Sequence, residues 1–410
     1  MSLVPSEVVL SYAEAAECVL HHAEKLRRAE HAVDQAPLLA ASGRVLAQPI
    51  VADRNLPPFP RSTRDGFACR AGKLTAGPLR VAGLLRAGEP WMSGTLAAGD
   101  AVEIMTGAAV PPGADCVVMI EHVEVSGGFV RLTAPRTLAP GENIVDAGSE
   151  ARAGDILVPA GRRMTVPQIA AAAACGYATL AVFARPRVAI LATGDELVDV
   201  IRTPLPHQIR NSNSYSLAAQ TLAAGAAPAI LPVVRDDWAA TEEALAAATG
   251  RDLILLSGGV SVGKFDFVER ALLRRGAEFQ FTGARIQPGR PVVFGRLPDA
   301  YFFGLPGNPV STMVTFALFV APLLRALGGE ADAGPRFVTA RLEEEMRVKT
   351  GLTRFLPARL ESDMRDARVR PVPWHGSGDL AAAAQANGFV VVPETTEQLS
   401  AGERVSVLLL

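Results

Sequence analysis

The stretch Leu305-Pro306-Gly307-Asn308-Pro309-Val310-Ser311 joins a short apolar segment, 301–304, to a longer apolar segment, 311–324. The first has the character of a buried strand and the second that of a buried helix. Two prolines and a glycine between them force a tight turn. Such a turn directs several backbone N–H groups and the positive helix end to one point, so it predicts an anion site.

Two similar turns occur upstream. Thr193-Gly194-Asp195-Glu196 follows the apolar segment 188–192, and Ser257-Gly258-Gly259-Val260-Ser261-Val262-Gly263 follows the apolar segment 253–256. Strand-like and helix-like segments alternate through this region, which predicts a central doubly wound, mostly parallel α/β domain. Because ligands of such sheets bind at the carboxyl ends of the strands, we expect the three turns to meet at one site.

The patterns predict an α/β multidomain protein with four domains. The capping box Ser11-Tyr12-Ala13-Glu14 starts a helix in the first of them. Short β-type segments broken by glycine and proline indicate a β-rich insertion, and alternating segments near the C-terminus indicate a small β-barrel. The predicted domains are an elongated helical and mixed domain (5–50 plus 147–184), the inserted β-rich domain (51–146), the doubly wound domain (185–329) and the C-terminal β-barrel (330–410).

Composition narrows the possible functions. A chain of 410 residues is too long for one hydrophobic core. Lys and Arg total 40 against 42 Asp and Glu, and this net charge of -2 gives no reason to expect nucleic acid or an anionic membrane as partner. The cysteines are widely spaced and predict reduced packing residues of a cytosolic protein; they are Cys18, Cys69, Cys116 and Cys175.

Two uncharged segments, 164–184 and 301–324, are interrupted by proline and glycine. The helical part of the second falls short of the roughly 20 residues that a bilayer requires. The N-terminus lacks the basic and then apolar layout of a signal peptide. We therefore expect a soluble, cytoplasmic protein with no membrane segment.

Carboxylates follow the predicted strands at Asp195 and Glu196, at Asp236 and Asp237, and at Asp266. Oxygen ligands beside an anion-binding turn are typical of a Mg²⁺ site. Asp is also a favoured N-cap, and a predicted helix begins directly after the second pair. One of that pair is therefore expected to cap the helix, and the sequence leaves open which one.

Residues 258–264 fit the pattern G-x-x-x-x-G-K, but Phe265 stands where a phosphate loop needs Ser or Thr for magnesium. This excludes an ATPase of that class and leaves either a phosphate-holding loop or a structural turn. The polar loops at 55–67 and 104–115, taken alone, are more typical of turns than of catalysis. Six histidines show no ligand spacing, so zinc is not expected.

Six motifs occur in one order along the chain: S-x-x-D-G-F-A at 62–68, I-M-T-G-A at 104–108, T-G-D-E-L at 193–197, S-G-G-V-S-V-G at 257–263, Q-P-G-R-P at 287–291 and L-P-G-N-P-V-S at 305–311. With these motifs the chain resembles the MoeA family of molybdopterin molybdenumtransferases, which includes the gephyrin E domain. The resemblance covers nearly the whole chain.

The resemblance implies a four-domain homodimer with a MogA-like central domain and a site shared between subunits. It implies insertion of molybdenum from molybdate into adenylylated molybdopterin, with Mg²⁺-dependent release of AMP. Transient contacts with molybdopterin adenylyltransferase and with recipient molybdoenzymes are expected as well. We expect no contact with nucleic acid or membrane.

The resemblance also assigns residues. Glu196, Asp236 and Asp266 would hold the metal or face the nucleotide, and Asp65 and Thr106 would complete the catalytic set from the other subunit. Arg354, Ser377, Ser311 and Pro288 match positions that line the molybdate pocket. The remaining expected substrate contacts are Thr193, Gly194, Asp195, Ser257, Gly258, Gly259, Ser261, Lys264, Gln287, Arg290, Pro306, Gly307, Asn308 and Pro309.

The chain departs from the family at four positions. Many members carry lysines where this sequence has Gly283 and Gln287, whereas Arg64 stands where an apolar residue is usual and Lys264 where an acid is frequent. We hypothesise that Arg64, Lys264 and Arg285 partly replace the missing charge. The loss of the lysines keeps a second function open, a carrier or scaffold for the cofactor that makes none of it. A pyrophosphatase acting on another dinucleotide is a third possibility.

Overall fold

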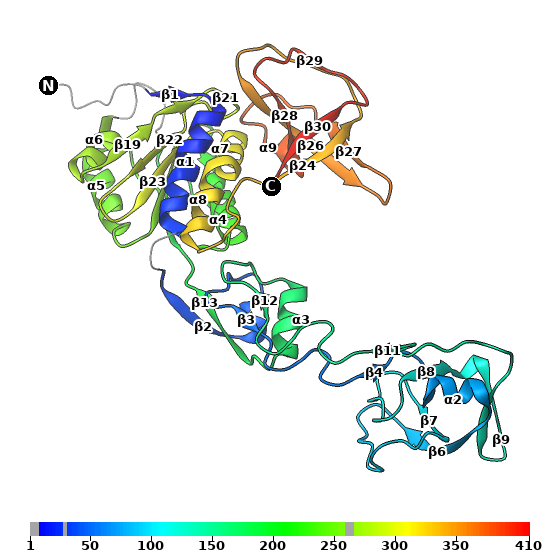
Figure 1. Cartoon of the computed structure of the whole chain (residues 1–410). Helices are drawn as coiled ribbons and strands as arrows, with labels where there is room; N and C mark the ends of the chain where they lie inside the picture. Colours follow the sequence, from blue (N-terminus) through cyan, green and yellow to red (C-terminus); the bar gives the residue numbers. More distant parts are fainter. Residues whose placement is uncertain (1–7, 28–30, 259–265) are drawn as a thin grey trace.

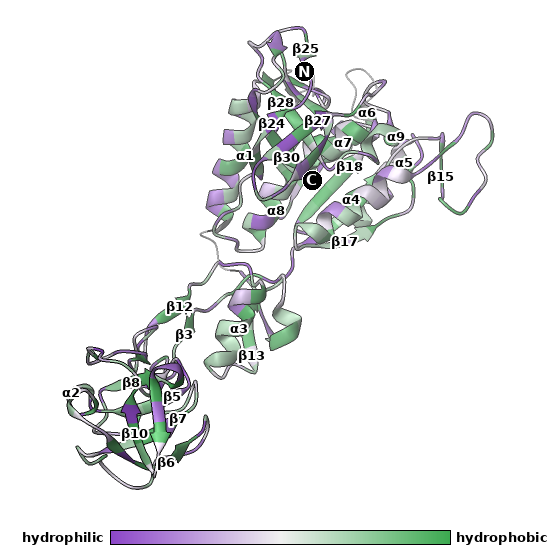
Figure 2. Cartoon of the chain, turned by 90° about the vertical axis from the view of Figure 1, so that its right-hand side faces the viewer, coloured by the Kyte–Doolittle hydropathy of each residue, from purple (hydrophilic) through white to green (hydrophobic). Residues whose placement is uncertain are grey.

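The computed structural model describes residues 8–27, 31–258 and 266–410. The molecule is elongated, as two views at right angles show (Figures 1 and 2). The α/β domain and the C-terminal β-barrel lie together at one end, and the inserted β-rich domain lies at the other. A small mixed domain separates them. The predicted α/β multidomain fold class is confirmed.

The central domain contains a six-stranded sheet of order β17-β14-β18-β23-β22-β19. Its first four strands are parallel, and β22 and β19 add an antiparallel edge. The sheet strands are β14 (Arg187–Ala192), β17 (Ala227–Ile230), β18 (Leu253–Ser257), β19 (Glu278–Phe281), β22 (Val293–Arg296) and β23 (Tyr301–Leu305). The helices are α4 (Ser212–Ala223), α5 (Trp238–Ala247), α6 (Asp266–Arg274), α7 (Pro309–Thr315) and α8 (Ala321–Leu327).

Alternate residues of the sheet strands enter two different cores. Val188, Ile190 and Leu255 pack with α4, α7 and α8 on one face, whereas Ala189 and Leu191 pack with α5 and α6 on the other. Because both faces are covered, the central strands β14 and β18 are apolar over most of their length. Strand β14 pairs with β17 on one side and with β18 on the other, so the winding direction reverses at β14 and opens a crevice at its carboxyl end.

The run from α7 to α8 is continuous through a π-helical turn, η3 (Phe316–Val320). Residues 309–327 are long and apolar enough to cross a membrane by length and composition, but 78% of the most apolar window is buried inside the protein. This segment is the central core helix of the α/β domain, as predicted from its apolar pattern.

Helix α1 (Tyr12–Arg27) begins at the predicted capping box, in which Glu14 N donates to Ser11 Oγ (3.2 Å) and Ser11 N donates to Glu14 Oε2 (2.7 Å). Its apolar residues Ala15 and Val19 are buried in the core of the α/β domain, where the helix packs beside α8 (Figure 1). The expectation that all of residues 5–50 belong to the elongated domain is therefore corrected for this helix. An apolar helix face specifies that it is buried, but not which domain covers it.

The elongated domain contains the strand pairs β2–β13 and β3–β12 around helix α3. The inserted domain is built on a sheet of order β8-β5-β7-β6-β10-β9. The elements of the elongated domain are β2 (Val33–Pro37), η1 (Leu38–Ala41), β3 (Ile50–Val51), β12 (Ile156–Val158), α3 (Val166–Ala174) and β13 (Thr179–Phe183). The elements of the inserted domain are β4 (Arg61–Ser62), β5 (Gly66–Cys69), α2 (Ala71–Ala76), β6 (Leu79–Leu85), β7 (Asp100–Ile104), β8 (Cys116–Met119), η2 (Ile120–His122), β9 (Val123–Ser126), β10 (Phe129–Leu132) and β11 (Ile144–Val145).

Five C-terminal strands close into the predicted barrel, because β26 pairs with β28 as well as with β27. The two-residue strand β21 (Ile286–Gln287) of the preceding domain adds to β26 in parallel and joins the barrel to the α/β domain. The barrel elements are β24 (Phe337–Leu342), β26 (Thr353–Ser362), β27 (Ala367–Pro371), β28 (Gly388–Val392) and β30 (Arg404–Leu409), with β25 (Met346–Arg347), β29 (Gln398–Leu399) and α9 (Leu380–Ala383) outside the closed sheet.

The junction between the elongated domain and the α/β domain contains a largely buried ion pair. Arg163 Nη2 donates to Glu330 Oε2 at 2.6 Å and also to the carbonyl of Ala224 (3.1 Å), and its Nη1 donates to the carbonyl of Gly43 (2.8 Å). The side chains of Arg163 and Glu330 are 19% and 9% exposed. One arginine therefore connects segments from both domains.

We expect Glu330→Ala to destabilise the protein by about 2–4 kcal/mol, because it leaves the buried Arg163 charge unpaired. The measurement is the thermal unfolding midpoint together with hydrogen exchange at the junction. Glu345→Ala is the matched control, because its ion pair with Arg347 is exposed on both sides. Equal thermal unfolding midpoints for Glu330→Ala and Glu345→Ala would contradict a stabilising role of Glu330.

Candidate functional site

The three turns predicted to converge do converge, at the carboxyl ends of β14, β18 and β23. Thr193 N donates to the carbonyl of Ser257 (3.0 Å), and Gly258 N donates to the carbonyl of Leu305 (3.3 Å). Gly258 has φ +87°, and a Cβ there would lie 2.6 Å from the carbonyl oxygen of Thr193. Only glycine allows these turns to approach so closely.

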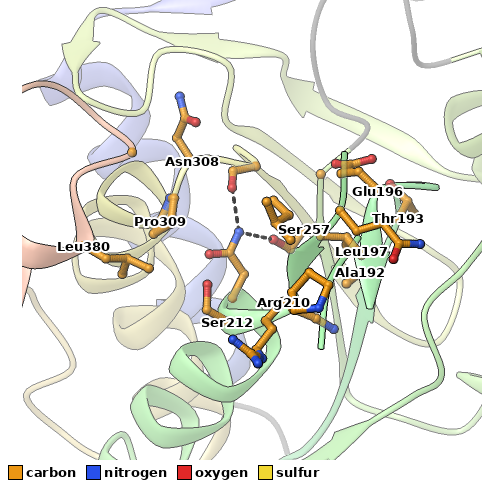
Figure 3. A pocket seen from close by; sticks show the side chains of 18 residues that line it. Ala192, Thr193, Glu196, Leu197, Arg210, Ser212, Ser257, Asn308, Pro309 and Leu380 are labelled. Atoms are coloured by element: carbon orange, nitrogen blue, oxygen red, sulfur yellow. Dashed lines mark hydrogen bonds between the residues drawn. The ribbon is translucent and has the colours of Figure 1, made fainter. Parts of the chain in front are cut away.

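A cavity of about 560 Å³ opens where the turns meet. Figure 3 shows Thr193 and Glu196 on one side of it and Asn308 and Pro309 on the other, with Ser257 between them. Its position is the crevice where the sheet reverses its winding direction, the usual ligand site of such sheets. The other lining residues are Ala192, Leu197, Pro204, Gln208, Ile209, Arg210, Asn211, Ser212, Asn213, Gly258, Gly307, Gly378 and Leu380.

The first turn of α4 also lines this cavity and was not predicted as part of the site. Asn211 caps the helix by accepting from Ser214 N. Asn213 Nδ2 donates to Ser257 Oγ (3.1 Å) and to the carbonyl of Gly307 (2.7 Å), and so connects two of the three turns. The run Asn211-Ser212-Asn213-Ser214 at the start of a predicted helix was the available signal. It can equally well be interpreted as simple capping.

The short strands β15 (Leu197–Val198) and β16 (Ile209–Arg210) form the base of a loop that projects from the domain beside the cavity (Figure 2). Arg210 lines the cavity and is solvent-exposed. Its Nε donates to the carbonyl of Arg202 (3.0 Å). This loop therefore contributes a positive charge to the cavity, and no sequence pattern predicted it.

The predicted acidic residues divide into two groups. Asp237 is the helix cap, because its side chain accepts from Ala240 N (2.9 Å). Asp236 N lies 3.4 Å from Asp195 Oδ1, which places Asp195, Glu196 and Asp236 along one loop edge. The Glu196 carboxylate folds over Gly194, where a Cβ would lie 2.7 Å from Oε2. Of the two aspartates that the sequence left open, Asp236 is thus the one that is not the cap.

The structure does not describe all of the predicted site residues. Gly259, Ser261 and Lys264 fall outside the described residues. Asp266 begins α6, but its side chain is not among those described. Within the described part of the chain, no three His, Cys, Asp or Glu side chains gather as a metal-binding group. Mg²⁺ commonly uses one or two carboxylates together with substrate phosphates, so Glu196 and Asp236 fit that ion.

A second group of predicted residues meets between the α/β domain and the barrel. Gln287 lies opposite Arg354 in the β21–β26 pairing, and Arg354 Nε donates to Gln287 Oε1 at 2.8 Å. Asn308 Nδ2 donates to Ser377 Oγ (2.8 Å), and Val310 N donates to the Ser377 carbonyl (3.0 Å). The barrel residues therefore contact the same turn that borders the cavity.

The Q-P-G-R-P turn packs on the helix that follows the L-P-G-N-P-V-S turn. Gly289 has φ +112°, and a Cβ there would lie 2.5 Å from Thr315 Cγ2 and 3.6 Å from the Ser311 carbonyl. Pro288 is buried, whereas the Arg290 side chain is exposed. The carbonyl of Arg290 accepts from Ala284 N (2.9 Å). Pro288 and Ser311 thus lie in one contiguous region.

Asp65 and Thr106 form a pair in the inserted domain, where Thr106 N and Oγ1 both donate to Asp65 Oδ1 at 2.7 Å. These two hydrogen bonds, first from the backbone and then from the hydroxyl, hold the pKa of Asp65 below its ordinary value. Asp65 is therefore ionised at neutral pH. Within one chain the inserted domain lies at the end of the molecule opposite the cavity (Figure 1).

Three family models match most of the chain. Residues 10–176 match the "MoeA N-terminal region (domain I and II)", 189–326 the "Probable molybdopterin binding domain" and 339–410 the "MoeA C-terminal region (domain IV)". The chain belongs to the MoeA family.

MoeA relatives with curated names agree along nearly the full length. The molybdopterin molybdenumtransferase of Bacillus subtilis (strain 168) is 34% identical over 90% of this chain and 87% of its own. The protein of the same name from Nostoc sp. is 35% identical over 91% of this chain and 88% of its own.

Two solved structures share the fold along both chains. A molybdopterin biosynthesis MoeA protein from Pyrococcus horikoshii is 27% identical, covers 98% of this chain and 100% of its own, and gives a TM-score of 0.80. A second structure of a MoeA protein from that organism is 32% identical and gives a TM-score of 0.76 over 98% and 99% of the two chains.

The structure bears on one of the two positions where a lysine of the MoeA pattern is missing. Gly283 lies in the short strand β20 (Gly283–Ala284), which pairs with β1 (Val9–Leu10). A Cβ at this position would lie 3.1 Å from Val9 Cγ2, which is tighter than an ordinary van der Waals contact. A lysine at position 283 would therefore require the Val9 side chain to shift.

Proposed function

We propose that this chain is a molybdopterin molybdenumtransferase that inserts molybdenum from molybdate into adenylylated molybdopterin and releases AMP. The observation that carries the proposal is the cavity where three turns meet beside Glu196, bordered on its other side by Gly378 and Leu380 of the barrel domain. Two mutually repelling anions, molybdate and a pyrophosphate, must be brought together in this reaction. The names of the relatives support the same activity.

The residues offer a specific means of offsetting that repulsion. The N-terminus of α4 lines the cavity and would receive phosphate oxygens, whereas the N–H groups of Thr193 and Gly258 are taken up by hydrogen bonds between the turns. Arg354 and the serines at 311 and 377 would receive the molybdate oxygens. Glu196 and Asp236, with Asp266, would hold a Mg²⁺ ion that neutralises charge on the phosphoanhydride when bound. Fixed dipoles would act more strongly once bound substrate excludes water from the cavity.

We further propose a homodimer in which Asp65 and Thr106 of one subunit complete the site of the other. This proposal is supported by the separation of the two groups within one chain (Figure 1) and by the ionised, firmly held state of Asp65. A cytoplasmic location and brief contacts with the adenylyltransferase and with recipient molybdoenzymes belong to the same proposal.

Subunit mixing tests the shared site. Asp65→Asn and Glu196→Gln homodimers are each expected to be nearly inactive. Co-refolded mixtures should regain about a quarter of the wild-type rate, because half the dimers are mixed and each then contains one intact site. A mixture that stays as inactive as its parents would contradict a site built from two subunits. Each variant mixed with itself is the control.

Incubation of the purified protein with adenylylated molybdopterin, Mg²⁺ and molybdate tests the overall reaction. We expect AMP and active cofactor to appear in equal amounts. Tight substrate binding without AMP would favour the carrier, and AMP without cofactor would favour the pyrophosphatase.

The charge-replacement hypothesis remains a prediction. Arg285 Nε lies 3.8 Å from Glu394 Oε2, both side chains being partly exposed, so its charge is partly balanced. Arg64 is exposed in the inserted domain, and Lys264 lies outside the described residues. Unchanged activity after neutralising all three would refute the hypothesis.

A further inference from the structure

Arg354 carries a charge that the described part of the protein does not balance. Its side chain lies at the start of β26, and the residue is 8% exposed. Its Nη1 donates to the backbone carbonyls of Lys349 and Leu352, and its Nε donates to Gln287 Oε1. Among the described residues it forms no ion pair within 4.0 Å. A buried, unpaired guanidinium is costly, so an anion bound beside it would be strongly favoured.

The side-chain partner of this guanidinium is Gln287, and strand pairing places the two residues side by side. Gln287 and Arg354 are direct neighbours in the parallel β21–β26 pairing. On its other side the Gln287 segment is held by Gly289, which packs against Thr315 of α7. The backbone of Gln287 is thus held on two sides, while its side chain is solvent-exposed and its Oε1 is the only side-chain acceptor for Arg354 among the described residues.

We infer that Gln287 is a positioning residue, which orients the Arg354 guanidinium as a neutral acceptor so that its remaining N–H groups face a tetrahedral oxyanion. The inference rests on the proposed function for the identity of that oxyanion, molybdate. A lysine at position 287 has no acceptor atom and carries the same charge as Arg354, so it would repel the guanidinium instead of orienting it. Adding positive charge here would therefore weaken anion binding in this chain.

Three substitutions at position 287 distinguish the effect of orienting Arg354 from the effect of charge. Gln287→Met keeps the length and removes the acceptor, and we expect about tenfold weaker molybdate binding. Gln287→Lys should also weaken binding, by about threefold to tenfold, although it adds a positive charge. Gln287→Glu keeps the acceptor and balances the arginine charge, so it should weaken binding the most while leaving the unfolding midpoint unchanged or higher.

The measurement is calorimetric titration of the full-length protein with molybdate, and in parallel with sulfate and phosphate as other tetrahedral oxyanions. Gln398→Lys, at an exposed glutamine on β29 of the same barrel domain, is the matched charge control and should change nothing. In an Arg354→Lys background, Gln287→Met should have little further effect, because the two side chains act as one unit.

Binding by Gln287→Lys that equals or exceeds wild type would overturn the inference, as would wild-type affinity in Gln287→Met or full additivity with Arg354→Lys. A wild-type protein that binds none of the three oxyanions would overturn it too. If the wild type binds oxyanions and the variants follow the expected order, but no cofactor is made, the proposed function fails and the role of Gln287 stands.

Discussion

Glu196→Gln is expected to lower the rate of molybdenum insertion by about 100-fold to 1,000-fold, the usual cost of losing one group that stabilises developing charge. The amide keeps the shape of the side chain, which folds over Gly194, but removes its negative charge. The proposed Mg²⁺ would then be held less tightly beside the phosphoanhydride. AMP release under single-turnover conditions, repeated over a series of Mg²⁺ concentrations, measures this effect.

Glu243→Gln is the control, since Glu243 is an exposed residue of α5 in the same domain and should behave as wild type. Partial recovery of the Glu196 variant at high Mg²⁺ would support metal binding. A rate close to wild type at every Mg²⁺ concentration would remove Glu196 from the metal-binding set.

Gly66→Ala is expected to destabilise the inserted domain by about 3 kcal/mol or more, beyond the usual cost of overpacking. Gly66 lies in strand β5, between β7 and β8. A Cβ at this position would lie 1.9 Å from the backbone carbonyl oxygen of Val118, and backbone cannot move aside as a flexible side chain can. Because Asp65 precedes this glycine, the variant should lose activity as well as stability.

Hydrogen exchange resolved by domain, together with thermal unfolding, measures the loss in Gly66→Ala. Gly72→Ala in helix α2 is the matched control, because no atom outside its own helical turns lies within 4 Å of its Cβ position. That variant should be neutral or slightly more stable. Protection of the β5 and β8 amides at the wild-type level in Gly66→Ala would contradict the expectation.

The sequence determined the local elements of the α/β domain well. The apolar segments at 188–192 and 253–256 became the parallel strands β14 and β18, and the segment after Pro309 became the buried core helix. Long apolar segments separated by glycine-rich turns have few alternatives to a covered parallel sheet. The convergence of the three turns followed from that topology alone. Capping at Ser11 also followed from local pattern, because its partner lies three residues away.

Only the tertiary structure decided which surfaces meet. Helix α1 could have been buried by either neighbouring domain, and it packs on α8 because the α/β domain offers it an apolar face. Asp236 and Asp237 are equivalent in sequence, and only the helix geometry makes Asp237 the cap. Gln287 and Arg354 lie 67 positions apart and meet only because β21 joins the barrel sheet. Such contacts depend on register between distant segments, and no local pattern encodes that register.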